Sequence, residues 1–294
     1  MSGRGGSQMK LGFIGTGVMG NSLVKHLLDN HHEVAIYTRT AKKAENLVEA
    51  GAMLFESPKQ VADKADVIFT MVGYPQDVEE VYFGENGLLQ HAKENAVLID
   101  LTTSKPNLAQ RIFQAAAERG IHTLDAPVSG GDIGAQKGTL SIMVGGEQPT
   151  FISVLPLLEL FGENIIYQGP AGSGQHTKMC NQINIASNMI GVCESLIYAK
   201  KAGLDPETVL RSISTGAAGS WSLSNLAPRM IKEDFEPGFY IKHFIKDMKI
   251  AAEEAEAWGL DLPGLRLSLQ MYESLAAEGY NDNGTQTLIK YFDK

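Results

Sequence analysis

The segment AGSGQHTKMCNQ, residues 171–182, contains a lysine that is followed by two amide side chains at helical spacing. Asn181 and Gln182 follow Lys178 at i+3 and i+4, so a helix would bring all three to one face. A lysine in an otherwise apolar helix is costly unless its amine reaches water, a ligand or a partner. Such an amine can donate a proton to a developing alkoxide and, when neutral, accept one. Lys178 is therefore a candidate general acid/base, although a lysine that extends to solvent at a helix end explains the pattern equally well. His176 is the rival acid–base group, but its spacing places it on another helix face.

A second candidate lies in DAPVSGGDIGAQKGTL, residues 125–140. A predicted strand ends there, and Ser129, Gly130 and Gly131 follow. Such a turn would expose a hydroxyl and several backbone N–H groups, which suit a carboxylate. A glycine-rich surface loop without a ligand is the alternative interpretation. The pattern favours a site for the acidic end of a small substrate.

The third candidate is LGFIGTGVMGNSL, residues 11–23, which contains GxGxxG. The motif follows an apolar strand, opens a helix and is followed by the strand EVAIYTR, so it sits in a βαβ unit. Gly15 permits the tight turn, Gly17 lets the backbone approach a pyrophosphate, and Gly20 allows close helix–strand packing. This predicts a dinucleotide-binding loop made of Gly15, Thr16, Gly17, Val18, Met19 and Gly20.

The end of the second strand bears on the choice of dinucleotide. NAD enzymes commonly carry a carboxylate there that binds the ribose 2′-hydroxyl. Here the sequence is YTRT, in which Arg39 lies between Thr38 and Thr40. A guanidinium can make charge-assisted hydrogen bonds to a 2′-phosphate. We therefore expect NADP to be preferred, with NAD as an alternative cofactor; a solvated surface arginine is the competing interpretation.

The order of elements predicts two domains. From Met9 to about Tyr167, apolar strand-like runs alternate with helical segments such as 21–30, 41–50 and 106–119. The strand-like runs are KLGFIG, HEVAIYTR, DVIFTMV, AVLIDLTT, HTLDAPV and LSIMVGG. This alternation is typical of a mainly parallel sheet covered on both faces. We expect a disordered leader or tag at 1–8, an α/β Rossmann-like NADP-binding domain at 9–171, and an all-α substrate and dimerisation domain at 172–294.

Helical signals dominate the second half. One helix of nearly 30 residues should end at Gly203, and its apolar and small residues on most faces predict that it is buried. Asp205 is placed to cap a helix that begins at Pro206, and a further amphipathic helix should close at Gly259. Trp221, among small residues, is either a pocket wall or part of the helix core.

Composition limits the classes of function. The chain has 294 residues, 44% of them hydrophobic, and its 25 basic and 34 acidic side chains give a net charge of −9. This acidity argues against a nucleic-acid binder, which needs a concentrated basic surface. Cys180 and Cys193 provide neither a disulfide framework nor a metal ligand set, and we expect reduced, mostly buried thiols. No membrane span or secretory signal is evident, so the cytoplasm is the expected location.

Four motifs in order resemble the β-hydroxyacid dehydrogenase family: GFIGTGVMG, DAPVSGG, GSGQHTKMCNQ and FIKDMKIA. This family includes 3-hydroxyisobutyrate dehydrogenase, tartronate semialdehyde reductase and glyoxylate/succinic semialdehyde reductases, and is related to 6-phosphogluconate dehydrogenase. The resemblance runs from Met9 to the C-terminus. It implies an NAD(P)-dependent oxidoreductase that transfers a hydride between nicotinamide and a short β-hydroxyacid or its semialdehyde.

The resemblance also implies residue roles. Lys178 would be the general acid/base, and the Ser129–Gly131 turn would bind the substrate carboxylate. Asn181 would hydrogen-bond the substrate near the reacting carbon. Family members place this asparagine three or four positions after the lysine, so Gln182 remains an alternative.

Further implied residues concern the cofactor. Lys246 would contact it near the nicotinamide, with Asp247 beside it, and Thr103 would pack near the nicotinamide ribose. At the position where many relatives have Leu-Pro, this chain has Val72-Gly73. The backbone of these two residues would then contact the cofactor. Asp77 stands where some relatives have an asparagine that touches the cofactor. Without the family, Lys246 and Asp247 would be an ordinary charged pair on an amphipathic helix.

Two alternatives remain beside the dehydrogenase. A non-catalytic cofactor-binding module keeps this fold without the lysine, and an imine reductase generally lacks both the lysine and the Ser-Gly-Gly. The long helix and the resemblance predict a homodimer or homotetramer. Neither nucleic acid nor membrane is an expected partner.

Overall fold

The computed structural model describes residues 9–292 and divides into two compact units between Lys178 and Met179. The expected leader, residues 1–8, lies outside the described residues. The division falls after the boundary expected at 171/172, because the first residues of the long helix α9 pack on strands of the first unit.

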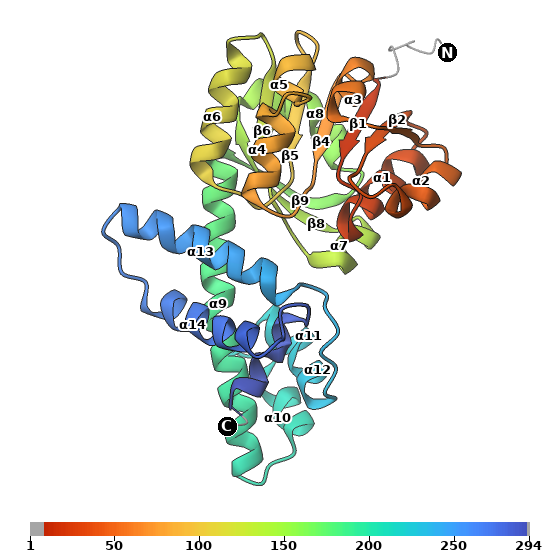
Figure 1. Ribbon diagram of the computed structural model, residues 1–294. Coiled ribbons are helices and arrows are strands. Elements are labelled where there is room, and N and C mark those ends of the chain that lie inside the picture. Colours follow the sequence, from red (N-terminus) through yellow and green to blue (C-terminus); the bar gives the residue numbers. More distant parts are fainter. Residues whose placement is uncertain (1–8, 293–294) are drawn as a thin grey trace. The chain divides into compact units, whose positions relative to one another are not determined.

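A nine-stranded sheet forms the centre of the first unit within the described residues (Figure 1). The strand order is β3-β2-β1-β4-β5-β6-β8-β7, and β9 pairs with β8. The strands from β3 to β6 are parallel, whereas β8 runs antiparallel to β6 and β7. The strands are β1 (Leu11–Ile14), β2 (Val34–Tyr37), β3 (Met53–Phe55), β4 (Val67–Thr70), β5 (Val97–Asp100), β6 (His122–Asp125), β7 (Val128–Ser129), β8 (Leu140–Gly146) and β9 (Gly162–Gly169).

Helices cover both faces of this sheet. One apolar core contains residues of α1, α2, α7 and α8, and a second contains residues of α3, α4, α5 and α6. Strand β1 contributes to both cores, because Phe13 joins the first and Ile14 the second. The elements are α1 (Val18–Asp29), the 3₁₀ helix η1 (Ala41–Ala44), α2 (Glu45–Glu49), α3 (Pro58–Lys64), α4 (Pro75–Phe83), α5 (Leu88–His91), α6 (Pro106–Ala117), α7 (Gly131–Lys137) and α8 (Gln148–Leu158). The Rossmann-like α/β organisation expected from the sequence is confirmed.

The second unit is helical within its described residues. Helix α9 (Ser173–Lys201) begins in the first unit, and its residues from Met179 onward belong to the second. The later elements are α10 (Pro206–Ile213), α11 (Trp221–Asn225), α12 (Ala227–Ile231), α13 (Ile241–Ala257), α14 (Pro263–Ala277) and the 3₁₀ helix η2 (Thr285–Phe292). As expected, the Asp205 carboxylate caps α10 by accepting a hydrogen bond from the Thr208 N–H. Among residues 9–292, no helix combines the length and apolar character that crossing a bilayer requires.

Two expectations about burial were wrong, and one of the two interpretations of Trp221 is excluded. Helix α9 is not buried on all faces, because a stripe of small and polar residues is exposed along it. The stripe comprises Cys180, Asn184, Ser187, Gly191, Glu194 and Tyr198. The thiol of Cys180 is therefore exposed, and only Cys193 is buried. Trp221 begins α11 and is 62% exposed, so it does not belong to the helix core.

The carboxyl ends of four parallel strands lie in one row. Ile14 pairs with Thr70, Thr70 with Asp100, and Asp100 with Asp125. The loops that follow these residues consequently leave the sheet along the same edge. Ligands of open α/β sheets bind at this carboxyl edge, and the predicted dinucleotide loop starts there.

Gly20 provides a test of the packing that closes this loop. A Cβ at Gly20 would lie 2.0 Å from the carbonyl oxygen of Gly15, whereas nothing lies within 4 Å of a Cβ at Gly17. We expect Gly20→Ala to lower the free energy of unfolding by about 1–3 kcal/mol, because backbone must move. The control Gly17→Ala should stay within about 0.5 kcal/mol of the wild type. Urea unfolding measures both, and equal stabilities of the two variants would contradict this packing.

Candidate active site

The glycine-rich loop has the geometry that a dinucleotide requires. Gly15 has φ +96°, and a Cβ there would lie 2.1 Å from the Met71 carbonyl oxygen, so only glycine fits. Gly17 is exposed and precedes α1, with open space where a side chain would be. A phosphate group can therefore approach this backbone and the N-terminus of α1. The other loop positions are Thr16, which is buried, Val18, which is exposed, and Met19, which is half-buried.

Arg39 follows β2 and forms an ion pair. Its Nη1 lies 2.9 Å from Asp77 Oδ1, while Asp77 Oδ2 accepts a hydrogen bond from the Tyr74 N–H at 3.1 Å. Asp77 thus holds the start of α4 and contacts the arginine that could select the cofactor. Thr38 is half-buried, and Arg39 and Thr40 are exposed, so this end of β2 is accessible.

The loops after β4 and β5 are tied together. The Val72 N–H donates to Thr102 Oγ1 at 3.0 Å, and the Thr102 N–H donates to Asp100 Oδ1 at 3.0 Å. Gly73 and Thr103, the next residues of these two loops, are half-buried. The two predicted cofactor contacts, at residues 72–73 and at Thr103, therefore lie on neighbouring loops that are bonded to each other.

The Ser-Gly-Gly turn begins at the end of β7. Gly130 and Gly131 both have positive φ, +131° and +63°, a backbone path that favours glycine at two successive positions. Ser129 and Gly131 are half-buried and Gly130 is exposed. The turn therefore presents its hydroxyl and backbone near the protein surface, where a small acid could reach it.

The Lys178 amine lies beside this turn. Lys178 is only 6% exposed, and its Nζ donates a hydrogen bond of 2.8 Å to the carbonyl oxygen of Val128, the residue before Ser129. The side chain is therefore enclosed rather than extended into solvent from a helix end. Two segments 50 residues apart in the chain, both singled out from the sequence, are in direct contact.

Two functional candidates had been missed, Asp125 and Gln175. The buried Asp125 carboxylate accepts hydrogen bonds from the N–H groups of Gly172 and Gln175, at 2.8 and 2.9 Å. The Gln175 side chain bonds backbone atoms of Thr102 and Ser104. Both residues stand inside the quoted motifs, but their partners lie 47–73 positions away, so no local pattern indicated their roles.

Burial raises the pKa of Asp125 from 3.8 to about 6, although the backbone N–H donors favour its charged form. Between pH 3.8 and about pH 6, the folded protein therefore keeps a proton on Asp125 that the unfolded chain releases. The group's contribution to stability is complete below about pH 4 and falls as the pH rises through 6, by up to about 3 kcal/mol.

The variant Asp125→Asn tests this linkage, because an amide does not titrate in this range. The free energy of unfolding of the wild type, minus that of the variant, should decrease between pH 4 and pH 7. Urea unfolding at several pH values measures this difference. A difference that is constant or that increases with pH contradicts the raised pKa.

The remaining predicted residues lie in the second unit and form a bonded chain. Asn181 Nδ2 donates to Gln182 Oε1 at 2.8 Å, and Gln182 Nε2 donates to Asp247 Oδ2 at 2.8 Å. Lys246 Nζ lies 2.9 Å from Asp247 Oδ1, and the two side chains are 12% and 2% exposed. They are therefore a nearly enclosed ion pair rather than the ordinary charged surface pair that the helix pattern alone suggested.

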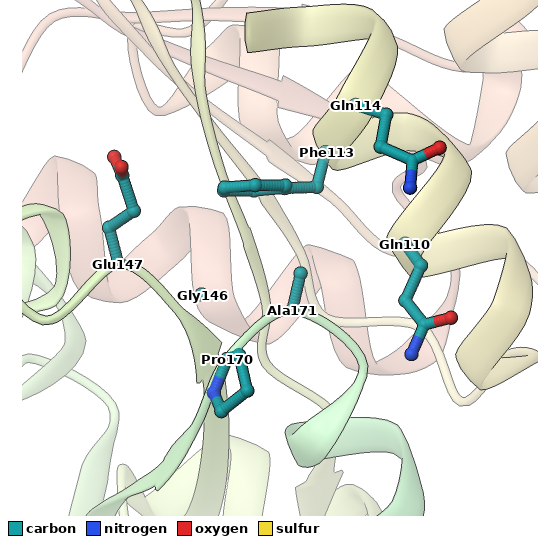
Figure 2. Close-up of a pocket in the computed structure, with 7 residues that line it drawn as sticks. All are labelled: Gln110, Phe113, Gln114, Gly146, Glu147, Pro170 and Ala171. Atoms are coloured by element: carbon teal, nitrogen blue, oxygen red, sulfur yellow. The ribbon is translucent and has the colours of Figure 1, made fainter.

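A surface pocket of about 260 Å³ lies elsewhere on the first unit (Figure 2). Gln110, Phe113 and Gln114 of α6 line it, together with Gly146, Glu147, Pro170 and Ala171. None of the predicted site residues lines this pocket, so the candidate site is the strand-end region described above.

Known sequence families match nearly the whole described chain. Residues 10–169 match the family described as the NAD-binding domain of 6-phosphogluconate dehydrogenase. Residues 172–292 match the family described as NAD-binding of NADP-dependent 3-hydroxyisobutyrate dehydrogenase. Both halves of the chain therefore point to the same group of enzymes.

Individual relatives agree with this assignment. The chain is 62% identical to the uncharacterized oxidoreductase YkwC of Bacillus subtilis over 97% of this chain and 99% of that protein. It is 41% identical to 2-hydroxy-3-oxopropionate reductase of Escherichia coli, with 96% of each chain covered. The solved structure of Mycobacterium tuberculosis 3-hydroxyisobutyrate dehydrogenase with L-serine is 28% identical, with a TM-score of 0.90 over 98% of this chain and all of that one. The protein belongs to the NAD(P)-dependent hydroxyacid dehydrogenase family that includes 3-hydroxyisobutyrate dehydrogenase and 2-hydroxy-3-oxopropionate reductase.

Proposed function

We propose that this protein is an NADP-preferring oxidoreductase that interconverts a short β-hydroxyacid and its semialdehyde. The observation that carries the proposal is the hydrogen bond from the Lys178 amine to Val128, directly before the Ser129–Gly131 turn. It puts a proton donor next to a turn suited to a carboxylate. A substrate held by its acidic end at the turn would bring its carbonyl oxygen toward that amine.

Other residues would bind the cofactor, and Lys178 would transfer the proton. The loop Gly15–Gly20, Val72-Gly73 and Thr103 would hold the cofactor, whose nicotinamide supplies or accepts the hydride. In reduction, Lys178 stabilises the negative charge that develops on the carbonyl oxygen and then donates the proton to it. In oxidation, the neutral amine takes the hydroxyl proton. An ammonium carries three hydrogens, so it can donate to Val128 and to a substrate oxygen together.

The geometry favours Asn181 over Gln182 as the amide that contacts substrate. Gln182 is almost fully buried, and its amide group bonds both Asn181 and the carboxylate of Asp247. Asn181 is half-buried, and its amide lies at the end of this chain of bonds. Gln182 would then orient Asn181 and Asp247, while Lys246 would contact the cofactor near the nicotinamide.

The substrate is tested by a panel of short acids with aldehyde or ketone carbonyls. Glyoxylate and the semialdehydes of tartronate, succinate and methylmalonate differ in length and branching but share the carboxylate. Each is offered with NADPH and with NADH, and cofactor oxidation is followed by absorbance. Turnover of tartronate or methylmalonate semialdehyde, whose reduction gives a β-hydroxyacid, supports the proposal, and turnover of glyoxylate or succinate semialdehyde alone contradicts the β-position of the hydroxyl. Turnover of cyclic imines alone, or of no substrate, supports the imine reductase or the non-catalytic module.

The variant Lys178→Ala tests the general acid. We expect kcat to fall by about 10²–10⁴-fold, the usual contribution of a positioned proton donor. The dissociation constant of NADPH should change little, because the amine bonds the Val128 carbonyl, next to the Ser-Gly-Gly turn, rather than the dinucleotide loop. Steady-state kinetics and cofactor fluorescence measure the two quantities.

A matched control is Lys137→Ala, which removes an exposed lysine of α7. Its kcat should equal that of the wild type. Near-normal turnover of the Lys178→Ala variant would eliminate the proposed role of this lysine.

The preference for NADP is proposed to depend on Arg39 and to be moderated by Asp77. The guanidinium has five N–H donors, so it can keep its contact with Asp77 and still bind a 2′-phosphate. The Asp77 carboxylate, however, offsets part of the positive charge and would repel that phosphate. This pairing supports a preference that stays moderate and leaves NAD usable.

Two substitutions test this arrangement in opposite directions. Arg39→Asp should weaken NADP binding by about 10–100-fold, because charge-assisted hydrogen bonds are lost, and should shift the preference towards NAD. Asp77→Asn keeps an oxygen for the Tyr74 N–H but removes the negative charge, so it should strengthen NADP binding relative to NAD. Fluorescence titrations with both cofactors measure these changes. Unchanged NADP affinity in the Arg39 variant would show that this residue does not hold the phosphate.

A further inference from the structure

Gln175 joins two segments of the first unit through its side chain. Its Nε2 donates a hydrogen bond of 2.7 Å to the Thr102 carbonyl oxygen, and its Oε1 accepts one of 2.9 Å from the Ser104 N–H. The residue is fully buried, with 0% exposure. Both partners are backbone atoms, so the amide fixes the path of residues 102–104 against the first turn of α9.

The segment held by Gln175 is part of the strand-end region. Thr102 Oγ1 accepts the hydrogen bond from the Val72 N–H, and the Thr102 N–H donates to Asp100. Gln175 therefore ends a series of hydrogen bonds that connects α9 to the loops after β5 and β4. Thr103, the residue proposed to lie at the nicotinamide ribose, sits between the two backbone groups that Gln175 holds.

Strands β6 and β8 also fix the first turn of α9. The Asp125 carboxylate accepts the N–H groups of Gly172 and Gln175, which satisfies donors that a helix start leaves without helical partners. A Cβ at Gly174 would lie 2.4 Å from the carbonyl oxygens of both Asp125 and Met143. The helix start is therefore packed backbone against backbone on β6 and β8, with little room to slide.

Lys178 follows Gln175 by three residues, which is just under one helical turn. A rotation or shift of the first turn of α9 would move the base of the lysine side chain with it. The bond to Val128 fixes the amine at the other end of the same side chain. We propose that Gln175 is a positioning residue: its side-chain amide locks α9 to residues 102–104 and so sets the place of the Lys178 amine relative to the cofactor loop.

This inference rests on the proposed function, and a double-mutant cycle separates the two. Gln175→Met keeps the length and volume of the side chain but removes both hydrogen bonds. We expect it to lower kcat by about 10–100-fold, since a displacement near 1 Å of a catalytic group has effects of this size. In a Lys178→Ala background the same substitution should change kcat by less than about threefold, because the group it positions is absent.

A matched control is Gln286→Met in the second unit. Gln286 is also buried, and its Nε2 donates to the backbone carbonyls of Asp234 and Glu236 at 3.0 and 2.9 Å. We expect this substitution, like Gln175→Met, to lower the melting temperature, because hydrogen bonds to buried backbone groups are lost. It should leave kcat within about twofold of the wild type, because Gln286 bonds none of the groups proposed to be catalytic. If Gln175→Met does not fold, Gln175→Asn serves instead, because its shorter amide cannot reach both backbone partners.

The outcomes are distinguishable. An equal loss of kcat on Gln175→Met in both backgrounds, or no loss in either, overturns the positioning role while a large effect of Lys178→Ala keeps the proposed function. Near-normal turnover of Lys178→Ala overturns both. A loss of kcat in the wild-type background alone, without a comparable loss in Gln286→Met, supports the positioning role.

Discussion

The hydrogen bond between the Lys178 amine and the Val128 carbonyl is the contact on which the account of this protein depends. Enclosing an amine costs free energy unless polar atoms around it replace water. The carbonyl that does so belongs to the residue before the Ser-Gly-Gly turn. The contact that makes the burial tolerable therefore also brings the amine next to the turn that we propose for the substrate carboxylate. A chain that needed lysine only for solubility would leave the amine in water.

Around this contact, the first unit gathers its chemistry at the carboxyl ends of parallel strands. Ile14, Thr70, Asp100 and Asp125 pair in one row across the sheet. The loops proposed to bind the dinucleotide therefore leave the sheet along the same carboxyl edge. Asp125, at the end of that row, holds the start of α9 rather than a ligand. The sheet therefore positions both the loops proposed to hold the cofactor and the helix that carries Lys178.

The second unit contributes a set of buried side chains that bond one another. Gln182, Asp247 and Lys246 form an enclosed chain of hydrogen bonds and an ion pair. Breaking such a buried pair by removing one partner is strongly destabilising, since it leaves a charge without compensation. These residues hold each other in place, which suits groups that must present one amide and one amine in a fixed orientation.

Local features could be predicted from the sequence, and features set by long-range contact could not. The glycine-rich loop, the cap of Asp205 and the parallel strands follow from spacing within short windows. Strand β3 has only three residues, and none of them is fully buried. Most residues of β9 are exposed or half-buried, and its sequence GENIIYQG has only three apolar residues in a row. Both were therefore missed.

The same distinction applies to the site. Residue types and motif order singled out Lys178 and Ser129, and the structure brings the Lys178 amine to Val128, next to Ser129. Their roles in the chemistry stay predictions. Asp125 and Gln175 act through partners far along the chain, which no single-sequence pattern reveals. The exposed face of α9 was misjudged because small residues such as Gly191 fit a buried helix and a solvent-facing one equally well.

The most direct measurement is a crystal structure of the protein with NADP⁺ and a short β-hydroxyacid. We expect the acid's carboxylate to contact Ser129 and the following glycines, and Lys178 Nζ to lie about 2.6–3.2 Å from the substrate hydroxyl oxygen. A complex in which that hydroxyl bonds another side chain, with Lys178 out of reach of it, would contradict the proposed role of Lys178 as general acid/base.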